Sequence, residues 1–271
     1  MANSTIDSWQ PLRGYTSARI ALGRVGVATS TAVNLQLQLD HARARDAVHQ
    51  GLNVDALAAV CSASLADIAG NHRQHLLPAI QLSSQARDRH HYLQRPDLGR
   101  QLPELQWQAL AERAASQAPI DVALIVGDGL SSAAVSAHAA PVLAMLIAGL
   151  AELGLQLGPL CIASQARVAL ADDIGEALGA SLSVILIGER PGLSSPDSLG
   201  MYITYRPKRG CSDAERNCIS NIRDAGLSYQ QAVDTALYLI RGALLKGFSG
   251  TQLKDDSATL TASCLGVPFL K

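Results

Sequence analysis

Short apolar runs alternate with helical patterns through the second half of the chain. The runs lie at residues 122–126, 159–163 and 182–187. Each has the length and composition of a strand that is buried on both faces of a sheet. Residues 199–205 alternate between apolar and polar side chains, and this pattern predicts an edge strand.

Amphipathic stretches separate and follow these runs. They predict helices at residues 132–153, 170–178 and 228–246. Ser228 has a side chain suited to cap the last of them. Strands that alternate with helices form parallel sheets. We therefore expect an α/β fold, with a Rossmann-like parallel sheet flanked by helices.

The first 118 residues have helical patterns and no clear strand pattern. Helices are predicted at residues 31–50, 53–69, 76–92 and 104–116. The chain is thus predicted to have four parts, none of which repeats another. They are a flexible N-terminal segment (1–14), a helical N-terminal region (15–118), a Rossmann-like domain (119–256) and a C-terminal tail (257–271), to which we assign no role.

Charge and hydropathy exclude two kinds of partner. The formal net charge of the 271 residues is −1, so nothing attracts the chain to nucleic acid or to an anionic membrane. The longest apolar run, at residues 139–153, is interrupted by Pro141, Gly149 and Glu152. It is too short to span a bilayer. We therefore expect no nucleic acid and no membrane among the partners.

The five cysteines are scattered and odd in number. None forms a C-x-x-C pair, and no histidine cluster accompanies them, so a metal site is not expected. Such cysteines are typical of free thiols in a reducing compartment.

A glycine-rich turn lies between the first predicted strand and its helix. Residues 127–132 read GDGLSS and match the dinucleotide-binding pattern G-x-G-x-x-G except at the last position. No acidic residue follows the next strand at the usual distance, and the same residues also suit a plain strand-to-helix turn. Because ligands bind at the carboxyl ends of parallel strands, we predict Asp128 as an additional ligand contact.

The polar loop after residues 182–187 is the most informative segment. It begins with ERPGLSSPDS at residues 189–198 and continues to DAERNCISNIR at residues 213–223. These motifs resemble the signature of the small subunit of ethanolamine ammonia-lyase, an adenosylcobalamin enzyme. The resemblance extends to residues 18–24, 41–49 and 92–100, and it covers nearly the whole chain except its two ends.

The resemblance implies that Val168, Glu189 and Cys218 contact the cofactor. Val168 offers only backbone or van der Waals contact. Glu189 follows a predicted strand, where its carboxylate can accept hydrogen bonds from the amide groups of a corrin ring. Composition alone fits an ion pair of Glu189 with Arg190 or Arg206 equally well.

Cys218 is expected to be a contact residue and not a nucleophile. A nucleophilic thiol needs a nearby base, and no histidine follows His138 in the sequence. Without the resemblance, the position favours a buried structural thiol.

No residue of this chain is predicted to bind cobalt. The cobalamin motif D-x-H-x-x-G has only a partial counterpart at residues 88–93, within a predicted helix. The resemblance implies that the cofactor keeps its own dimethylbenzimidazole on the metal. We therefore assign neither a metal ligand nor a catalytic residue to this chain.

The resemblance also implies a reaction and a partner. Ethanolamine is converted to acetaldehyde and ammonia by radical chemistry that belongs to the cofactor. The substrate lies in the large subunit, so the chain is expected to work in a hetero-oligomer, in the cytoplasm or in an ethanolamine-utilisation microcompartment. The polar N-terminus is a candidate packaging segment. Two alternatives stay open: a stand-alone α/β enzyme with a nucleotide cofactor, and a non-catalytic assembly subunit.

Overall fold

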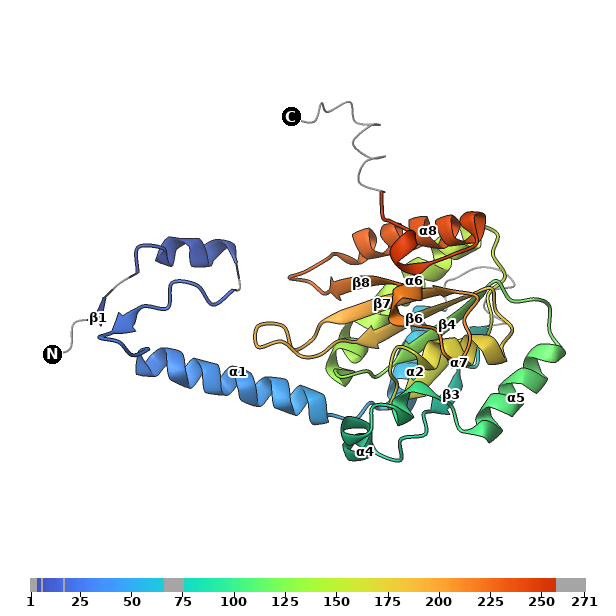
Figure 1. Ribbon diagram of the computed structural model, residues 1–271, viewed down its shortest axis with the longest axis horizontal. Helices are drawn as coiled ribbons and strands as arrows, with labels where there is room; N and C mark the ends of the chain where they lie inside the picture. Colours follow the sequence, from blue (N-terminus) through green and yellow to red (C-terminus); the bar gives the residue numbers. More distant parts are fainter. Residues whose placement is uncertain (1–3, 6, 17, 66–75, 257–271) are drawn as a thin grey trace, which may run out of the picture.

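A six-stranded mixed sheet forms the centre of the molecule (Figure 1). The computed structural model describes residues 4–5, 7–16, 18–65 and 76–256. In the order of the sheet, the strands are β3 (Ile80–Ser83), β5 (Cys161–Ser164), β4 (Val122–Gly127), β6 (Leu182–Gly188), β7 (Leu199–Tyr205) and β8 (Arg216–Ile222). The first four strands of this order are parallel, whereas β7 and β8 are antiparallel to their neighbours. The fold is therefore a mixed α/β fold with a mostly parallel sheet.

Helices cover both faces of the sheet. On one face lie α2 (Val54–Ser64), α6 (Ser132–Glu152) and α8 (Tyr229–Lys246). On the other face lie α5 (Glu104–Ala115) and α7 (Leu170–Ala177). Successive residues of a strand point to opposite faces, so Leu124 and Val126 of β4 enter the first core and Ile125 enters the second. This double burial explains the continuous apolar run of β4.

Most predicted elements of the second half are confirmed. The strands at residues 122–126 and 182–187 correspond to β4 and β6, and the run at 159–163 overlaps β5. Ser228 caps α8 by accepting a hydrogen bond from the backbone N–H of Gln231. The strand at residues 199–205 is also confirmed, but its predicted edge position is wrong because β8 pairs with its outer side.

Two strands escaped the sequence pattern. The helix predicted at residues 76–92 is wrong: residues 80–83 form β3, and only α4 (Arg89–Gln94) is helical in the later part. β3 forms because its backbone pairs in register with β5, from Ile80 opposite Cys161 to Ser83 opposite Ser164. β8 was expected to be part of a polar loop. Its polar residues suit an edge strand with one solvent-facing side.

The described residues include one helix, α6, that is long and apolar enough to cross a membrane by these two criteria alone. It extends beyond the apolar run noted at residues 139–153. However, 56% of its most apolar window is buried inside the protein. Its hydropathy follows from its position between the sheet and α8.

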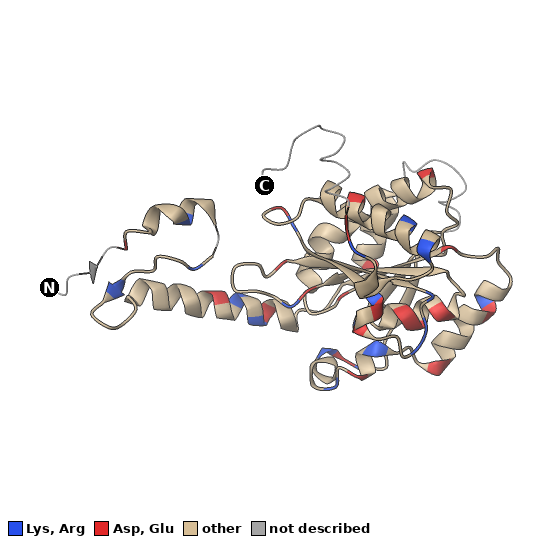
Figure 2. Cartoon of the chain, turned by 45° about the horizontal axis from the view of Figure 1, so that its top comes forward, with Lys and Arg blue, Asp and Glu red and all other residues tan. Residues whose placement is uncertain are grey.

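An N-terminal arm extends from the body (Figure 1). It consists of β1 (Ser4–Thr5), the 3₁₀ turn η1 (Gln10–Tyr15), β2 (Arg24–Val25) and α1 (Thr31–His49). The arm carries exposed apolar side chains, among them Trp9, Leu35 and Leu39. Figure 2 shows acidic and basic residues interspersed over the body.

The helices and strands test only one part of the predicted division of the chain into four segments. β3 shows that the region before residue 119 contributes a strand to the sheet. The boundaries at residues 14, 118 and 256 stay predictions. The tail at residues 257–271 and the end of the predicted helix at residues 66–69 lie outside the described residues.

Candidate functional site

Two adjoining pockets lie at the carboxyl ends of the parallel strands, and we call them together the strand-end site. The larger pocket has a volume of about 790 Å³, and the smaller has about 390 Å³. Arg167, Val168 and Tyr202 line both pockets. Ligand pockets commonly have volumes of about 300–1,000 Å³, and open α/β sheets bind ligands at this edge.

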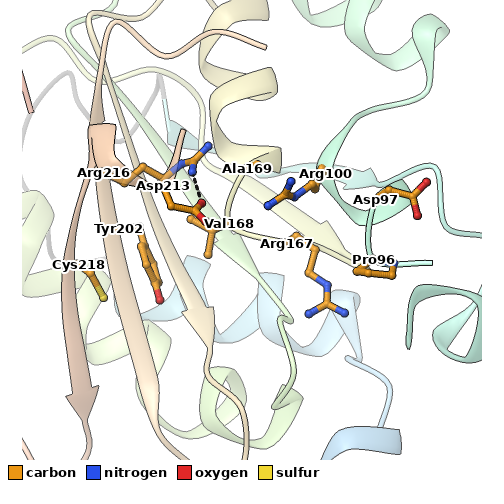
Figure 3. A pocket seen from close by; sticks show the side chains of 10 residues that line it. All are labelled: Pro96, Asp97, Arg100, Arg167, Val168, Ala169, Tyr202, Asp213, Arg216 and Cys218. Atoms are coloured by element: carbon orange, nitrogen blue, oxygen red, sulfur yellow. Dashed lines mark hydrogen bonds and ion pairs between the residues drawn. The ribbon is translucent and has the colours of Figure 1, made fainter. Parts of the chain in front are cut away.

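The structure brings the three predicted contact residues together around this site. Val168 lines both pockets, Glu189 lines the smaller one, and Cys218 lines the larger one. Figure 3 shows Cys218 and Tyr202 on neighbouring strands, with Val168 on the adjacent loop. The three residues come from segments that are far apart in the sequence. Their role as cofactor contacts stays a prediction.

Val168 lies on the loop between β5 and α7, which Asp128 holds in place. The Asp128 carboxylate accepts hydrogen bonds from the backbone N–H groups of Gln165 at 2.9 Å and Ala166 at 2.8 Å. Gln165 has a φ of +55°, a left-handed conformation that is uncommon for a residue with a side chain. The two bonds from Asp128 stabilise this turn and so position Val168.

The prediction that Asp128 contacts a ligand is wrong. Its side chain is completely buried. In addition to the two backbone hydrogen bonds, its carboxylate forms an ion pair with Arg89 at 3.2 Å. A buried carboxylate is stabilised by such partners. Asp128 therefore stabilises the loop that carries Val168 and does not face the pockets.

The glycine-rich turn at residues 127–132 serves close backbone packing. Gly129 has a φ of +56°, and a Cβ atom there would lie 2.1 Å from the carbonyl oxygen of Gly188. The same carbonyl accepts a hydrogen bond from the N–H of Leu130 at 2.9 Å. The structure thus supports the strand-to-helix turn interpretation of this motif. It does not favour a nucleotide cofactor.

Glu189, directly after β6, bonds to the residue before β7 and to β8, and we call these bonds the Glu189 clamp. Its carboxylate accepts hydrogen bonds from the hydroxyls of Ser198 and Ser220, both at 2.5 Å, and from the N–H of Asn221 at 3.3 Å. The ion-pair interpretation with Arg190 or Arg206 is wrong, because no ion pair in the described part of the chain includes Glu189.

The clamp leaves acceptor capacity for a ligand. A carboxylate has about four lone-pair sites, and Glu189 uses three of them for protein donors. Gly200 makes room beside it, since a Cβ atom there would lie 3.0 Å from Oε1 of Glu189. Glu189 lines the smaller pocket, and one of its acceptor positions therefore has no donor among the described residues.

Cys218 lies on β8, directly opposite Tyr202 of β7. The thiol is free and exposed, so the interpretation as a buried structural thiol is wrong. Desolvation by the pocket wall raises the pKa of Cys218, and the hydrogen bond from Tyr202 only partly offsets this effect. The sulfur therefore stays protonated at neutral pH, which suits a contact residue and not a nucleophile.

A buried ion pair fixes the wall that carries Cys218. Arg216 of β8 bonds to Asp172 of α7, and both side chains are almost fully buried. Arg216 also bonds to Asp213 at 2.5 Å, as Figure 3 shows. The bond to Asp172 attaches the edge strand β8 to α7 at the wall of the larger pocket.

The partial cobalamin motif at residues 88–93 has a local structural role. The Asp88 side chain caps α4 by accepting a hydrogen bond from the N–H of His91 at 2.8 Å. Across the described ranges, no group of three or more His, Cys, Asp or Glu side chains is placed to hold a metal ion.

Sequence reasoning missed three lining residues: Tyr202, Arg167 and Arg100. Tyr202 was expected to lie on an edge strand, so its central position between β6 and β8 was not foreseen. Arg100 ends one of the segments that carry the family resemblance, but no sequence pattern places it near Arg167. The place of Arg100 within a matching segment is the only signal that was available.

The structure so far defines an α/β protein with a ligand-sized site at the strand ends, and the comparisons specify its family. The family model described as "Ethanolamine ammonia-lyase light chain (EutC)" matches residues 6–254. The ethanolamine ammonia-lyase small subunit of Ralstonia nicotianae is 50% identical over 255 residues, which cover 94% of this chain and 90% of that protein. The small subunit of Azotobacter vinelandii is 49% identical with the same coverage of both chains, 94% and 90%. That of Pseudomonas fluorescens is 49% identical and covers 94% of this chain and 89% of the relative. This chain belongs to the ethanolamine ammonia-lyase light-chain family.

Proposed function

We propose that the chain is the small subunit of an ethanolamine ammonia-lyase and forms one side of an adenosylcobalamin site. The observation that carries this proposal is the arrangement of Val168, Glu189 and Cys218 around one strand-end site. The family membership supplies the reaction and the large-subunit partner. The parallel strands with helices on both faces form the Rossmann-like part that presents this site.

The residues of the site fit such a cofactor. Cobalamin combines a wide corrin ring with many side amides, so it needs apolar contact and scattered polar partners. Val168 offers an apolar surface and Glu189 retains an acceptor position. Desolvation raises the pKa of both Cys218 and Tyr202, so both side chains are neutral. The Nε atom of Arg167 is buried and has no hydrogen-bond partner. An unpaired buried donor is costly, so a ligand acceptor beside Arg167 stabilises the site.

The chain's own residues hold and orient the cofactor. Bound adenosylcobalamin supplies homolysis of its cobalt–carbon bond, which provides the radical that abstracts hydrogen from ethanolamine. The wall formed by the Glu189 clamp and by the Arg216–Asp172 pair is preorganised. Preorganisation reduces the entropy that is lost on binding. Cys218 and Arg100 are exposed at the larger pocket, so we infer that the large subunit covers this opening, excludes water and holds the substrate.

A cofactor titration tests the proposal. The chain, its large subunit and their complex are each titrated with adenosylcobalamin and followed by visible absorbance. We expect the complex to bind the cofactor and to deaminate ethanolamine, while the isolated chain binds weakly or not at all. Submicromolar binding by the chain alone contradicts a shared site. A stable complex that binds no cobalamin supports the non-catalytic assembly subunit instead.

The place of action follows from the same proposal. An ethanolamine ammonia-lyase subunit with free cysteines suits a reducing compartment. We place the complex in the cytoplasm or in an ethanolamine-utilisation microcompartment, without nucleic acid or membrane as a partner.

A further inference from the structure

Two arginines at the strand-end site have no acidic partner. Arg100 is exposed, and its guanidinium makes no hydrogen bond or ion pair within the described residues. Arg167 makes one long side-chain bond, from Nη2 to the carbonyl oxygen of Tyr92 at 3.5 Å. Its Nε atom is buried without a partner. The donors of both side chains are thus largely unused.

The fold holds these two arginines next to each other. The backbone N–H of Arg167 donates a hydrogen bond to the carbonyl oxygen of Gly99 at 2.8 Å, and Gly99 directly precedes Arg100. A Cβ atom at Gly99 would lie 2.8 Å from Cγ of Arg167, so only glycine leaves room for the arginine stem. Figure 3 shows both arginines on the same side of the larger pocket.

Tyr92 fixes the orientation of one of the two cations. The guanidinium of Arg167 lies 4.3 Å from the centre of the Tyr92 ring, within the range of a cation–π interaction. The Tyr92 hydroxyl donates a hydrogen bond to the carbonyl oxygen of Ala166 at 2.9 Å, and the ring is completely buried. Arg167 is therefore preorganised.

The acidic residues around the pockets do not neutralise this pair. Asp97 bonds to Arg95 at 2.7 Å, and Asp213 bonds to Arg216 at 2.5 Å. Glu189 is occupied by hydroxyl and amide donors. Two positive side chains that line one pocket attract an anion into it. Arginine is especially suited to phosphate, because its planar donors can bind two oxygens at once.

We propose that Arg100 and Arg167 bind a phosphodiester, namely the one in the nucleotide tail of cobalamin. This inference rests on the proposed function and adds an anion subsite to it. Arg167 directly precedes Val168, so the subsite adjoins a predicted corrin contact. The two arginines distinguish a complete cobalamin from a corrinoid without the tail.

A double-mutant cycle between protein and ligand tests the subsite. The complex with the large subunit is titrated with adenosylcobalamin and with adenosylcobinamide, which lacks the phosphate and the nucleotide. Arg100→Gln and Arg167→Gln each remove one cation, and Arg167→Lys keeps the charge but loses the planar donors. Arg113→Gln is the matched control, because Arg113 is exposed on α5 and lines neither pocket.

Each glutamine variant is expected to weaken adenosylcobalamin binding by about ten- to hundredfold, the effect of losing one charge-assisted hydrogen bond. Binding of adenosylcobinamide changes by less than about threefold, within the spread of additive effects. The lysine variant lies between wild type and glutamine, and Arg113→Gln has no effect on either ligand. Melting curves confirm that the variants are folded.

Two results overturn the subsite while leaving the proposed function intact. One is an equal loss of affinity for both corrinoids, which assigns the arginines a general supporting role. The other is unchanged affinity for adenosylcobalamin in both glutamine variants. If the wild-type complex binds neither corrinoid, the proposed function fails and the subsite fails with it.

Discussion

Replacing Glu189 by glutamine separates its structural and cofactor roles. Glutamine keeps the shape of the side chain and can still bond to Ser198, Ser220 and Asn221, because hydroxyls both donate and accept. It loses the charge that strengthens the two hydroxyl bonds at 2.5 Å. Charge assistance is worth about 1 kcal/mol per bond, and less where water competes. The clamp should therefore lose about 1–2 kcal/mol, which lowers Tm by about 2–8 °C.

The effect on the cofactor is expected in addition to this loss of stability. If the free acceptor position of Glu189 binds a corrin amide, cobalamin affinity falls by about 1–2 kcal/mol, roughly five- to thirtyfold. The Michaelis constant for ethanolamine is expected to change little, because the proposed function places the substrate in the large subunit. Cofactor titrations, melting curves and steady-state kinetics on the same assembled variant measure all three quantities.

Ser198→Ala is the matched control for Glu189→Gln. It removes one bond of the clamp while leaving the carboxylate charged. It should lower Tm by a similar amount and leave cofactor affinity unchanged. An unchanged affinity in Glu189→Gln refutes the contact with cobalamin. An equal loss of affinity in both variants shows that Glu189 acts by positioning the wall, and a rise confined to the ethanolamine Michaelis constant refutes both roles.

Three further predictions follow from the supporting structure. Cys218→Ser should leave substantial turnover in the assembled enzyme, because a protonated contact thiol does no covalent chemistry; a loss on the order of 10⁴-fold would identify a nucleophile. Gly129→Ala should cost more than about 3 kcal/mol in denaturant unfolding, because its Cβ meets backbone at 2.1 Å. Gly154→Ala is its control, since a positive φ of +70° without any neighbour within 4 Å costs only about 1–2 kcal/mol; equal losses would rule out the backbone contact. Asp172→Asn should destabilise the chain by about 3 kcal/mol, because Arg216 loses its buried charged partner and keeps only the exposed Asp213; a loss below about 1 kcal/mol in the same assay would contradict that role.

The predictable part of the fold is the part in which local pattern and tertiary environment agree. β4 and β6 are buried on both faces, so their apolar runs identify them directly. β3 has four residues with polar side chains at two of them, and its pairing with β5 overrides the local pattern. β8 is polar because it is an edge strand. A pattern within one segment does not contain the pairing partner, so these two strands could not be predicted from it.

The site also has residues that the sequence predicts and residues that it does not. Val168, Glu189 and Cys218 were all predicted from the family resemblance, and the place of Glu189 directly after a predicted strand agreed with it. The buried role of Asp128 depends on a loop that is about 40 residues away in the chain, since it accepts hydrogen bonds from Gln165 and Ala166. Arg100 and Arg167 line the same pocket because the backbone N–H of Arg167 donates a hydrogen bond to the carbonyl oxygen of Gly99. Such contacts are created by the tertiary fold and leave no local signal.

The Glu189 clamp also has a kinetic consequence. It joins Glu189, directly after β6, to Ser198, directly before β7, and to Ser220 and Asn221 of β8, so hydrogen bonds cross-link this wall of the strand-end site. If this site binds the proposed cofactor, release by movement of this wall breaks these three hydrogen bonds. The residence time of the cofactor is then governed by how often the two subunits separate, and we expect enzyme that holds its cofactor to exchange it only as fast as the complex dissociates.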